Sequence, residues 1–173
     1  EGETAGAQAL YEEALGVFLG ALGAEHPLVA SCLDSLGELR MQQGDAHGAR
    51  QYFQRALEVF ERTLGEDALE CALCLRNLAE ATRAEGNLAG SIPALRKSIG
   101  LLEELLGDEH PDIAAAHTSL AETYCMQGDF GAAQPHCEQA LVIFERVLGR
   151  EHPDLAIGLS NLAGVLFAKG DYS

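Results

Sequence analysis

The sequence predicts an all-α protein, a right-handed superhelical solenoid of antiparallel helix pairs with about four repeats and eight helices. Two observations predict this fold. One glycine recurs every 42 residues along the chain, and a Leu-Gly pair recurs at the same step. The glycines are Gly44, Gly86, Gly128 and Gly170, and the pairs begin at Leu22, Leu64, Leu106 and Leu148. A fixed period of about 20 to 50 residues is typical of stacked supersecondary units, each too small to bury its own apolar face.

The first helix of each repeat, here called the first-type helix, is predicted from helical spacing of residues such as Leu33, Leu36 and Gly37. The dipeptide His-Pro marks its start at 26–27, 110–111 and 152–153. Proline is best tolerated at the first helical position, where its missing N–H costs nothing. The recurring glycine is predicted to end this helix.

The second-type helix is predicted to open immediately after that glycine. The next residue is of a helix-capping type in every copy: Asp45, Asn87, Asp129 and Asp171. Positions related by the 42-residue step are called a column. Small residues fill two columns of this helix, and larger residues fill the column between them, as Phe53 does between Ala49 and Ala56. Small side chains let helices approach, so these columns predict the packing face.

We expect a single array cut from a longer protein. A second-type helix of a truncated repeat is expected in 1–26, full repeats in 27–68, 69–110 and 111–152, and a first-type helix of another truncated repeat in 153–173. The first of these helices is predicted from about Thr4 to Ala21, and the last from Pro153 to about Lys169.

The repeat at residues 117–141, HTSLAETYCMQGDFGAAQPHCEQAL, resembles the tetratricopeptide repeat, abbreviated TPR. The 42-residue period and the phrase Leu-Gly-x-x-His-Pro between units are similar to the kinesin light chain type of this repeat. Armadillo and HEAT repeats have periods near 40, but the Gly-Asp turn and the small-large-small spacing argue against them. The resemblance implies a non-enzymatic scaffold that binds a protein or peptide segment in a concave groove.

Composition excludes several other functions. The formal charge is −16, from 27 acidic against 11 basic residues, so phosphate backbones and anionic membranes would be repelled. No apolar run approaches the roughly 20 residues of a membrane span. Five cysteines without a disulfide-like spacing favour a reducing compartment, and we expect a cytoplasmic protein without cofactor or metal.

Two groups of residues resemble catalytic or metal-binding sites but have a packing interpretation. Cys71 and Cys74 are spaced like a redox pair, yet they occupy columns of buried small or aliphatic residues. Within one repeat, His117 and His136 could approach each other with Cys137 beside them, but His117 and Cys137 also lie in packing columns. The redox pair is kept as an enzymatic hypothesis, and packing is the preferred interpretation.

The remaining signal is a polar face on the first-type helices, which lines the concave groove in the resembled family. The predicted groove residues are Ser35, Glu38, Leu73, Arg76, Asn77, Glu80, Ser119, Glu122, Ser160, Asn161 and Phe167. In kinesin light chains, an asparagine just before the invariant leucine forms hydrogen bonds with the backbone of a bound peptide. Asn77 and Asn161 hold this place here, and Ser35 and Ser119 replace it in the other repeats. The other interpretation of this face is a solvated surface.

The predicted function is therefore a peptide-binding or protein-binding scaffold. Glu38, Glu80 and Glu122 form an acidic column, so the expected partner is a basic or mixed basic and apolar segment. The alternative, of a different class, is an architectural role in which the ends of the array associate with other copies.

Overall fold

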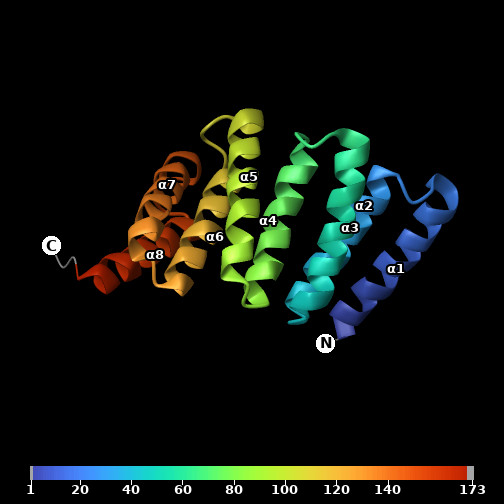
Figure 1. Cartoon of the computed structure of the whole chain (residues 1–173), viewed down its shortest axis with the longest axis horizontal. Helices are drawn as coiled ribbons and strands as arrows, with labels where there is room; N and C mark the ends of the chain where they lie inside the picture. The colour runs from blue at the N-terminus through green and yellow to red at the C-terminus, as the bar shows by residue number, and fades with distance from the viewer. Residues whose placement is uncertain (1, 171–173) are drawn as a thin grey trace. The chain divides into compact units, whose positions relative to one another are not determined.

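The computed structural model describes residues 2–170, which form eight α-helices and no strand (Figure 1). The chain divides into two compact units, Glu1–Asn87 and Leu88–Ser173. The first unit holds α1 (Gly2–Leu22), α2 (Pro27–Gln42), α3 (Ala46–Leu64) and α4 (Leu69–Ala84). The second unit holds α5 (Leu88–Leu106), α6 (Pro111–Gln127), α7 (Phe130–Leu148) and α8 (Pro153–Lys169). In each unit, consecutive helices contact one another. The predicted all-α fold of paired helices is confirmed.

The His-Pro dipeptide starts a helix by two devices at once. Proline occupies the first turn of α2, α6 and α8, and the preceding histidine is the N-cap. Nδ1 of His26 accepts a hydrogen bond from the backbone N–H of Leu28 at 3.2 Å, and His110 and His152 accept the equivalent bond. These bonds satisfy one of the unpaired donors at each helix start. Ala68 is the N-cap of α4 and offers no side-chain bond, so α4 begins without this device.

The two glycine series of the 42-residue period have one conformation in common. All eight glycines have φ between 74° and 95°, and no other residue in the described part of the chain has positive φ. This backbone conformation favours glycine because a Cβ would clash there. The carboxylate of Asp45 then accepts from the N–H of Gly48 at 2.9 Å, and Asp129 makes the matching bond to Ala132. Asp171 lies outside the described residues.

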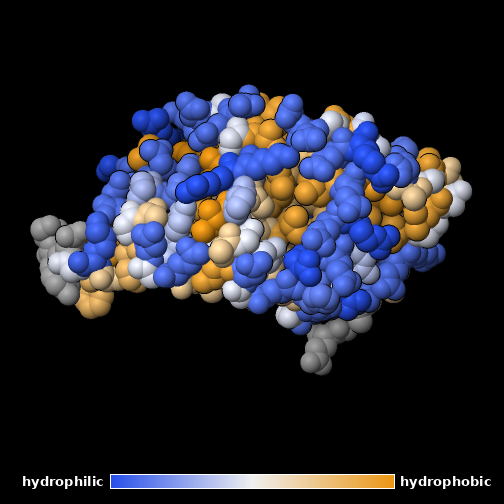
Figure 2. All heavy atoms as spheres, in the orientation of Figure 1, coloured by the Kyte–Doolittle hydropathy of each residue, from blue (hydrophilic) through white to orange (hydrophobic). Residues whose placement is uncertain are grey.

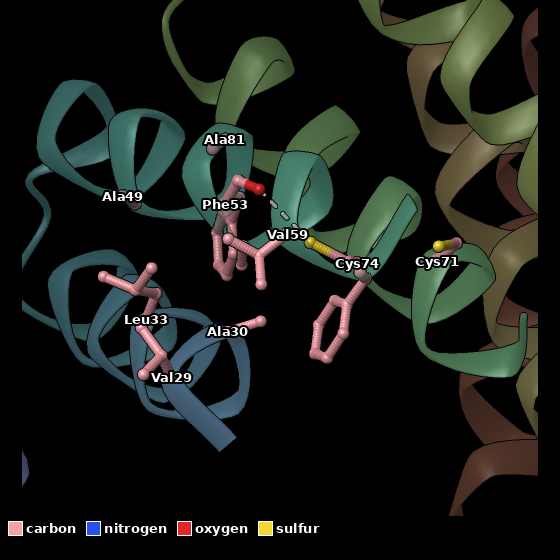
Figure 3. Close-up of a cluster of buried hydrophobic side chains, with 11 residues drawn as sticks. Val29, Ala30, Leu33, Ala49, Phe53, Val59, Cys71, Cys74 and Ala81 are labelled. Atoms are coloured by element: carbon pink, nitrogen blue, oxygen red, sulfur yellow. Dashed lines mark hydrogen bonds between the residues drawn. The ribbon is translucent and has the colours of Figure 1, made fainter. Parts of the chain in front are cut away.

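In the first unit, the core forms between α2, α3 and α4 (Figure 3). Gly37 of α2 lies against the ring of Phe53 on α3, so closely that a Cβ on Gly37 would be 2.5 Å from a ring carbon. Around this contact lie Val29, Leu33, Val59, Cys71 and Cys74, all buried. The predicted columns of small and large residues therefore form the helix interface.

The second unit repeats this packing with other side chains. Leu120, from the leucine column, has no exposed surface, and Leu95 and Cys137 fill the column of Phe53. Among the buried hydroxyls, Ser91 Oγ donates to the carbonyl of Leu88 at 2.9 Å. Buried small polar residues thus satisfy their hydrogen bonds within their own helix.

Candidate peptide-binding groove

A surface pocket of about 390 Å³ lies where α2 and α4, two successive first-type helices, contact each other. Its lining residues are Glu38, Met41, Gln42, Phe53, Arg76, Asn77 and Glu80. Four of these were predicted as groove residues from sequence, namely Glu38, Arg76, Asn77 and Glu80. The pocket thus has three charged side chains, two amides and an apolar part formed by Met41 and Phe53.

Asn77 is held by a carboxylate of the neighbouring helix. Its Nδ2 group donates to Asp34 of α2, at 3.3 Å to one carboxylate oxygen and 3.5 Å to the other. Burial raises the pKa of Asp34, and hydrogen bonds with Cys74 and Asn77 together with the charge of Arg76 partly oppose this rise. The amide is therefore oriented before any partner arrives, with its donor side toward Asp34.

Glu38 lies among other carboxylates. Burial raises the pKa of Glu38, the charges of Asp34 and Glu80 raise it further, and Arg76 and the Asn77 amide lower it. The pKa is raised mainly because the Glu38 carboxylate loses solvation, and further because neighbouring carboxylates repel it. Arg76 is the only basic residue among those that line this pocket.

This geometry changes one expectation for Asn77. The sequence suggests an amide that offers a donor and an acceptor to a bound backbone. In the structure its donor side faces Asp34 and Glu38, so the amide donor is already used within the chain. Replacing Asn77 by alanine therefore also removes a hydrogen bond from a half-buried carboxylate, at a cost of about 1 kcal/mol in stability.

The other predicted residues of the first unit lie outside this pocket lining. Ser35 of α2 and Leu73 of α4 are each half-buried. Their surfaces continue the same helix faces, and their participation in binding remains a prediction.

In the second unit, the predicted residues lie on α6 and α8, which also contact each other. Glu122 and Asn161 are half-buried, while Ser160 and Phe167 are exposed, Phe167 at 69%. Ser119 is 6% exposed and offers almost no surface. Of the five, Phe167 is the largest apolar side chain available to a partner.

Sequence analysis did not assign two of the lining residues, Gln42 and Phe53, to the groove. Phe53 was expected only in the core.

The two cysteines spaced like a redox pair are packed as small apolar residues. Cys71 and Cys74 have at most 1% exposure, and Cys74 Sγ donates to the backbone carbonyl of Phe53 at 3.3 Å (Figure 3). Burial raises the pKa of the Cys74 thiol, and the charge of Asp34 raises it further. A reactive cysteine needs the opposite shift, because the thiolate is the nucleophile.

His117 and His136 do approach each other, as the sequence suggested. Their Nδ1 atoms lie 3.0 Å apart and their rings stack with centroids 5.2 Å apart. Burial lowers the pKa of His117 to about 4, with a contribution from His136, and burial also lowers the pKa of His136. Tyr124 also stacks with His136, and its hydroxyl accepts a hydrogen bond from Arg96 at 2.6 Å. The histidines are a neutral part of the core between α6 and α7.

The search for other sites covered the described residues. It found no group of three or more His, Cys, Asp or Glu side chains arranged around a possible metal ion. It also found no helix with the length and apolar character required to cross a bilayer.

Comparison with known families identifies the repeat. The tetratricopeptide repeat family is matched at residues 34–104, 75–135 and 112–173, and a second description of the same repeat is matched at residues 1–58. The chain belongs to the tetratricopeptide repeat family. No curated protein is matched by this TPR chain.

Solved structures confirm the fold over nearly the whole TPR chain. BtubC (BKLC) from P. vanneervenii is similar at a TM-score of 0.89 and 25% identity, covering 99% of this chain and 68% of that one. A putative kinesin light chain from Podosopora anserina, described as having nearly identical TPR-like repeats, has a TM-score of 0.82 and 23% identity, with coverage of 99% and 81%. The apo form of RapI has a TM-score of 0.84 and 19% identity, with coverage of 98% and 59%. The family and these neighbours support a protein-interaction scaffold.

Proposed function

We propose that this TPR chain is a non-enzymatic scaffold that binds a basic segment of a partner protein on the faces of its first-type helices. The observation that carries the proposal is the α2–α4 pocket, in which Asp34 and Glu80 lie near Glu38 and Arg76 is the lining base. Burial raises the pKa of Asp34 and of Glu38, and the charges of Asp34 and Glu80 raise the pKa of Glu38 further. A bound cation would stabilise the ionised form of these carboxylates.

The pocket fits a lysine or arginine side chain in two respects. Its apolar part, Met41 and Phe53, suits the aliphatic stem of such a side chain. Its carboxylates suit the charged end, and the net charge of −16 would speed the approach of a basic partner.

The spacing of the acids suggests a spacing of basic residues in the partner. Glu38 and Glu80 occupy equivalent positions on helices in contact, whose axes are typically about 8 to 10 Å apart. Every second side chain of an extended segment points the same way, at an interval of about 7 Å. Two basic residues separated by one or two others would therefore match the two glutamates.

The proposed setting is the cytoplasm. Its support is that none of the five cysteines forms a disulfide, and four of them are buried.

Selection from a random peptide library tests the proposed function. We expect the peptides that bind the wild-type chain to be rich in lysine and arginine. Glu80→Gln should lower the affinity for a selected peptide several-fold. It should also reduce the salt dependence of that affinity. Glu104→Gln, on the exposed surface of a second-type helix, is the matched control and should have little effect. Selected peptides without basic residues, or with equal affinity for both variants, would contradict the proposal.

The alternative of self-association would use other surfaces, the outward faces of α1 and α8. Because those faces do not include Glu38, Glu80 or Arg76, the two functions can be tested separately.

A further inference from the structure

Four charged residues, here called the charged quartet, lie at the contact between α2 and α4. Asp34 and Glu38 are four residues apart on α2, and Arg76 and Glu80 hold the equivalent places on α4, one 42-residue step later. Residues four apart are neighbours on the surface of a helix. Three members of the quartet are acids, so Arg76 is its single base.

The charge of Arg76 acts on both acids of the facing helix. Burial raises the pKa of Asp34 and of Glu38, and the positive charge of Arg76 lowers both. Arg76 is half-buried and lines the same pocket as Glu38 and Glu80. A basic side chain of a partner that enters this pocket therefore meets a cation that the chain itself supplies.

The repeat does not require a base at position 76. The 42-residue column of Arg76 holds Asp34, Thr118 and Ser160 in the other repeats, so a carboxylate or a hydroxyl serves equally well there. Arg76 is also not part of the buried core cluster of the first unit. A role in the pocket accounts for this base better than a role in folding.

Asp34 keeps a hydrogen-bond donor when Arg76 moves away. Its carboxylate accepts from the amide of Asn77, at 3.3 Å and 3.5 Å to its two oxygens. Arginine has a long side chain whose charged end can return to water, and partly exposed ion pairs contribute little to stability. Displacing Arg76 from the quartet therefore costs little.

We propose that Arg76 is an internal competitor, which holds the place of the partner's basic side chain and is displaced from the charged quartet when a basic segment binds. This inference rests on the proposed function, because it concerns the same pocket. A segment with one basic residue only replaces the cation that leaves, whereas a segment with two adds a charge. Arg76 thus limits the affinity for basic segments and favours partners with more than one basic residue.

Isothermal titration calorimetry with the peptide acetyl-Lys-Ala-Lys-Ala-Lys-amide tests the proposal. Arg76→Gln should raise the affinity about three- to tenfold, because the competing cation is gone. Arg76→Lys keeps the charge and should bind like the wild type. Arg55→Gln is the matched control, since it makes the same change in net charge at an exposed position of α3, along which Figure 2 shows mainly hydrophilic residues. It should change the affinity little.

An NMR titration of the side-chain carboxyl groups examines the quartet without peptide. Because the charge of Arg76 lowers the pKa of Asp34 and of Glu38, Arg76→Gln should raise both pKa values. Arg76→Lys should leave them close to those of the wild type, which a purely steric role of the side chain does not predict. Circular dichroism confirms that each variant is folded.

The results distinguish this inference from the proposed function. If Glu80→Gln weakens peptide binding and Arg76→Gln does not strengthen it, the segment binds in the pocket without competition and the inference is overturned. If neither variant changes the affinity, or if neither the wild type nor Arg76→Gln binds the peptide, the proposed function fails and the inference fails with it. Unchanged carboxyl pKa values in Arg76→Gln would overturn the inference without any peptide.

Discussion

Replacing Gly37 by alanine tests the tightest contact in the first unit. The new Cβ would be 2.5, 2.8 and 2.9 Å from three carbons of the Phe53 ring, and ordinary contacts of this kind exceed 3.4 Å. The ring cannot move away easily, because Phe53 is 1% exposed and surrounded by other core residues. The substitution therefore forces either the ring or the two helices to shift.

The expected cost follows from two opposing effects. Overpacking a core typically costs about 1 to 3 kcal/mol, and three close ring contacts place this site in the upper half of that range. Alanine is more favourable than glycine inside a helix by up to about 1 kcal/mol. We expect Gly37→Ala to lower the free energy of unfolding by about 1 to 2 kcal/mol.

Urea denaturation followed by circular dichroism measures this change. Gly100→Ala is the control, because a Cβ there meets nothing within 4 Å, and it should be neutral or stabilising. In a Phe53→Leu background the ring is gone, so Gly37→Ala should lose its cost and reveal the coupling between the two positions. Equal or higher stability for Gly37→Ala in the wild-type background would refute the reasoning.

Three further predictions use the same chain. Leu120→Ala should lower the free energy of unfolding by about 2 to 5 kcal/mol, and Leu162→Ala, at a half-buried position of the same column, should cost less; equal costs would mean that the packing face is wrongly assigned. Because the pKa of His117 is about 4 when folded and 6.5 when unfolded, the unfolded chain binds more protons below pH 6.5. Stability should fall as the pH drops from 6.5 toward 4, by about 2 kcal/mol at pH 5, and His117→Leu should remove most of this loss; an unchanged pH dependence in the variant would contradict this. Asn77→Ala and Asn161→Ala should each weaken the binding of a selected peptide by about 0.5 to 1.5 kcal/mol, measured by isothermal titration calorimetry. Unaltered affinity in the double variant would exclude a role of the two asparagines in binding.

The helices could be predicted from sequence because their signals are local and repeated. Glycine at a positive φ, proline at the first helical position and an aspartate cap each depend on only a few neighbouring residues. The pairing of His26 with the backbone of Leu28 was not predicted, although its dipeptide was recognised as a start signal. A histidine cap depends on the ring orientation, which the residue pattern does not specify.

The site could be predicted only in part, because it depends on side chains from different helices. Glu38 and Glu80 of the acidic column line one pocket between α2 and α4, and their role in binding stays a prediction. The hydrogen bond from Asn77 to Asp34 requires a particular rotamer of Asn77 and a particular distance between α2 and α4. The 42-residue columns specify neither. The near-complete burial of Ser119 likewise depends on how neighbouring helices pack around α6.

The central claim is that first-type helices bind a basic segment, and NMR titration with a selected lysine-rich peptide tests it most directly. The account predicts that the side-chain amide signals of Asn77 and the backbone signals of Glu38, Arg76 and Glu80 shift saturably as peptide is added. Shifts confined to the exposed faces of α3, α5 and α7, with Asn77 unaffected, would contradict it.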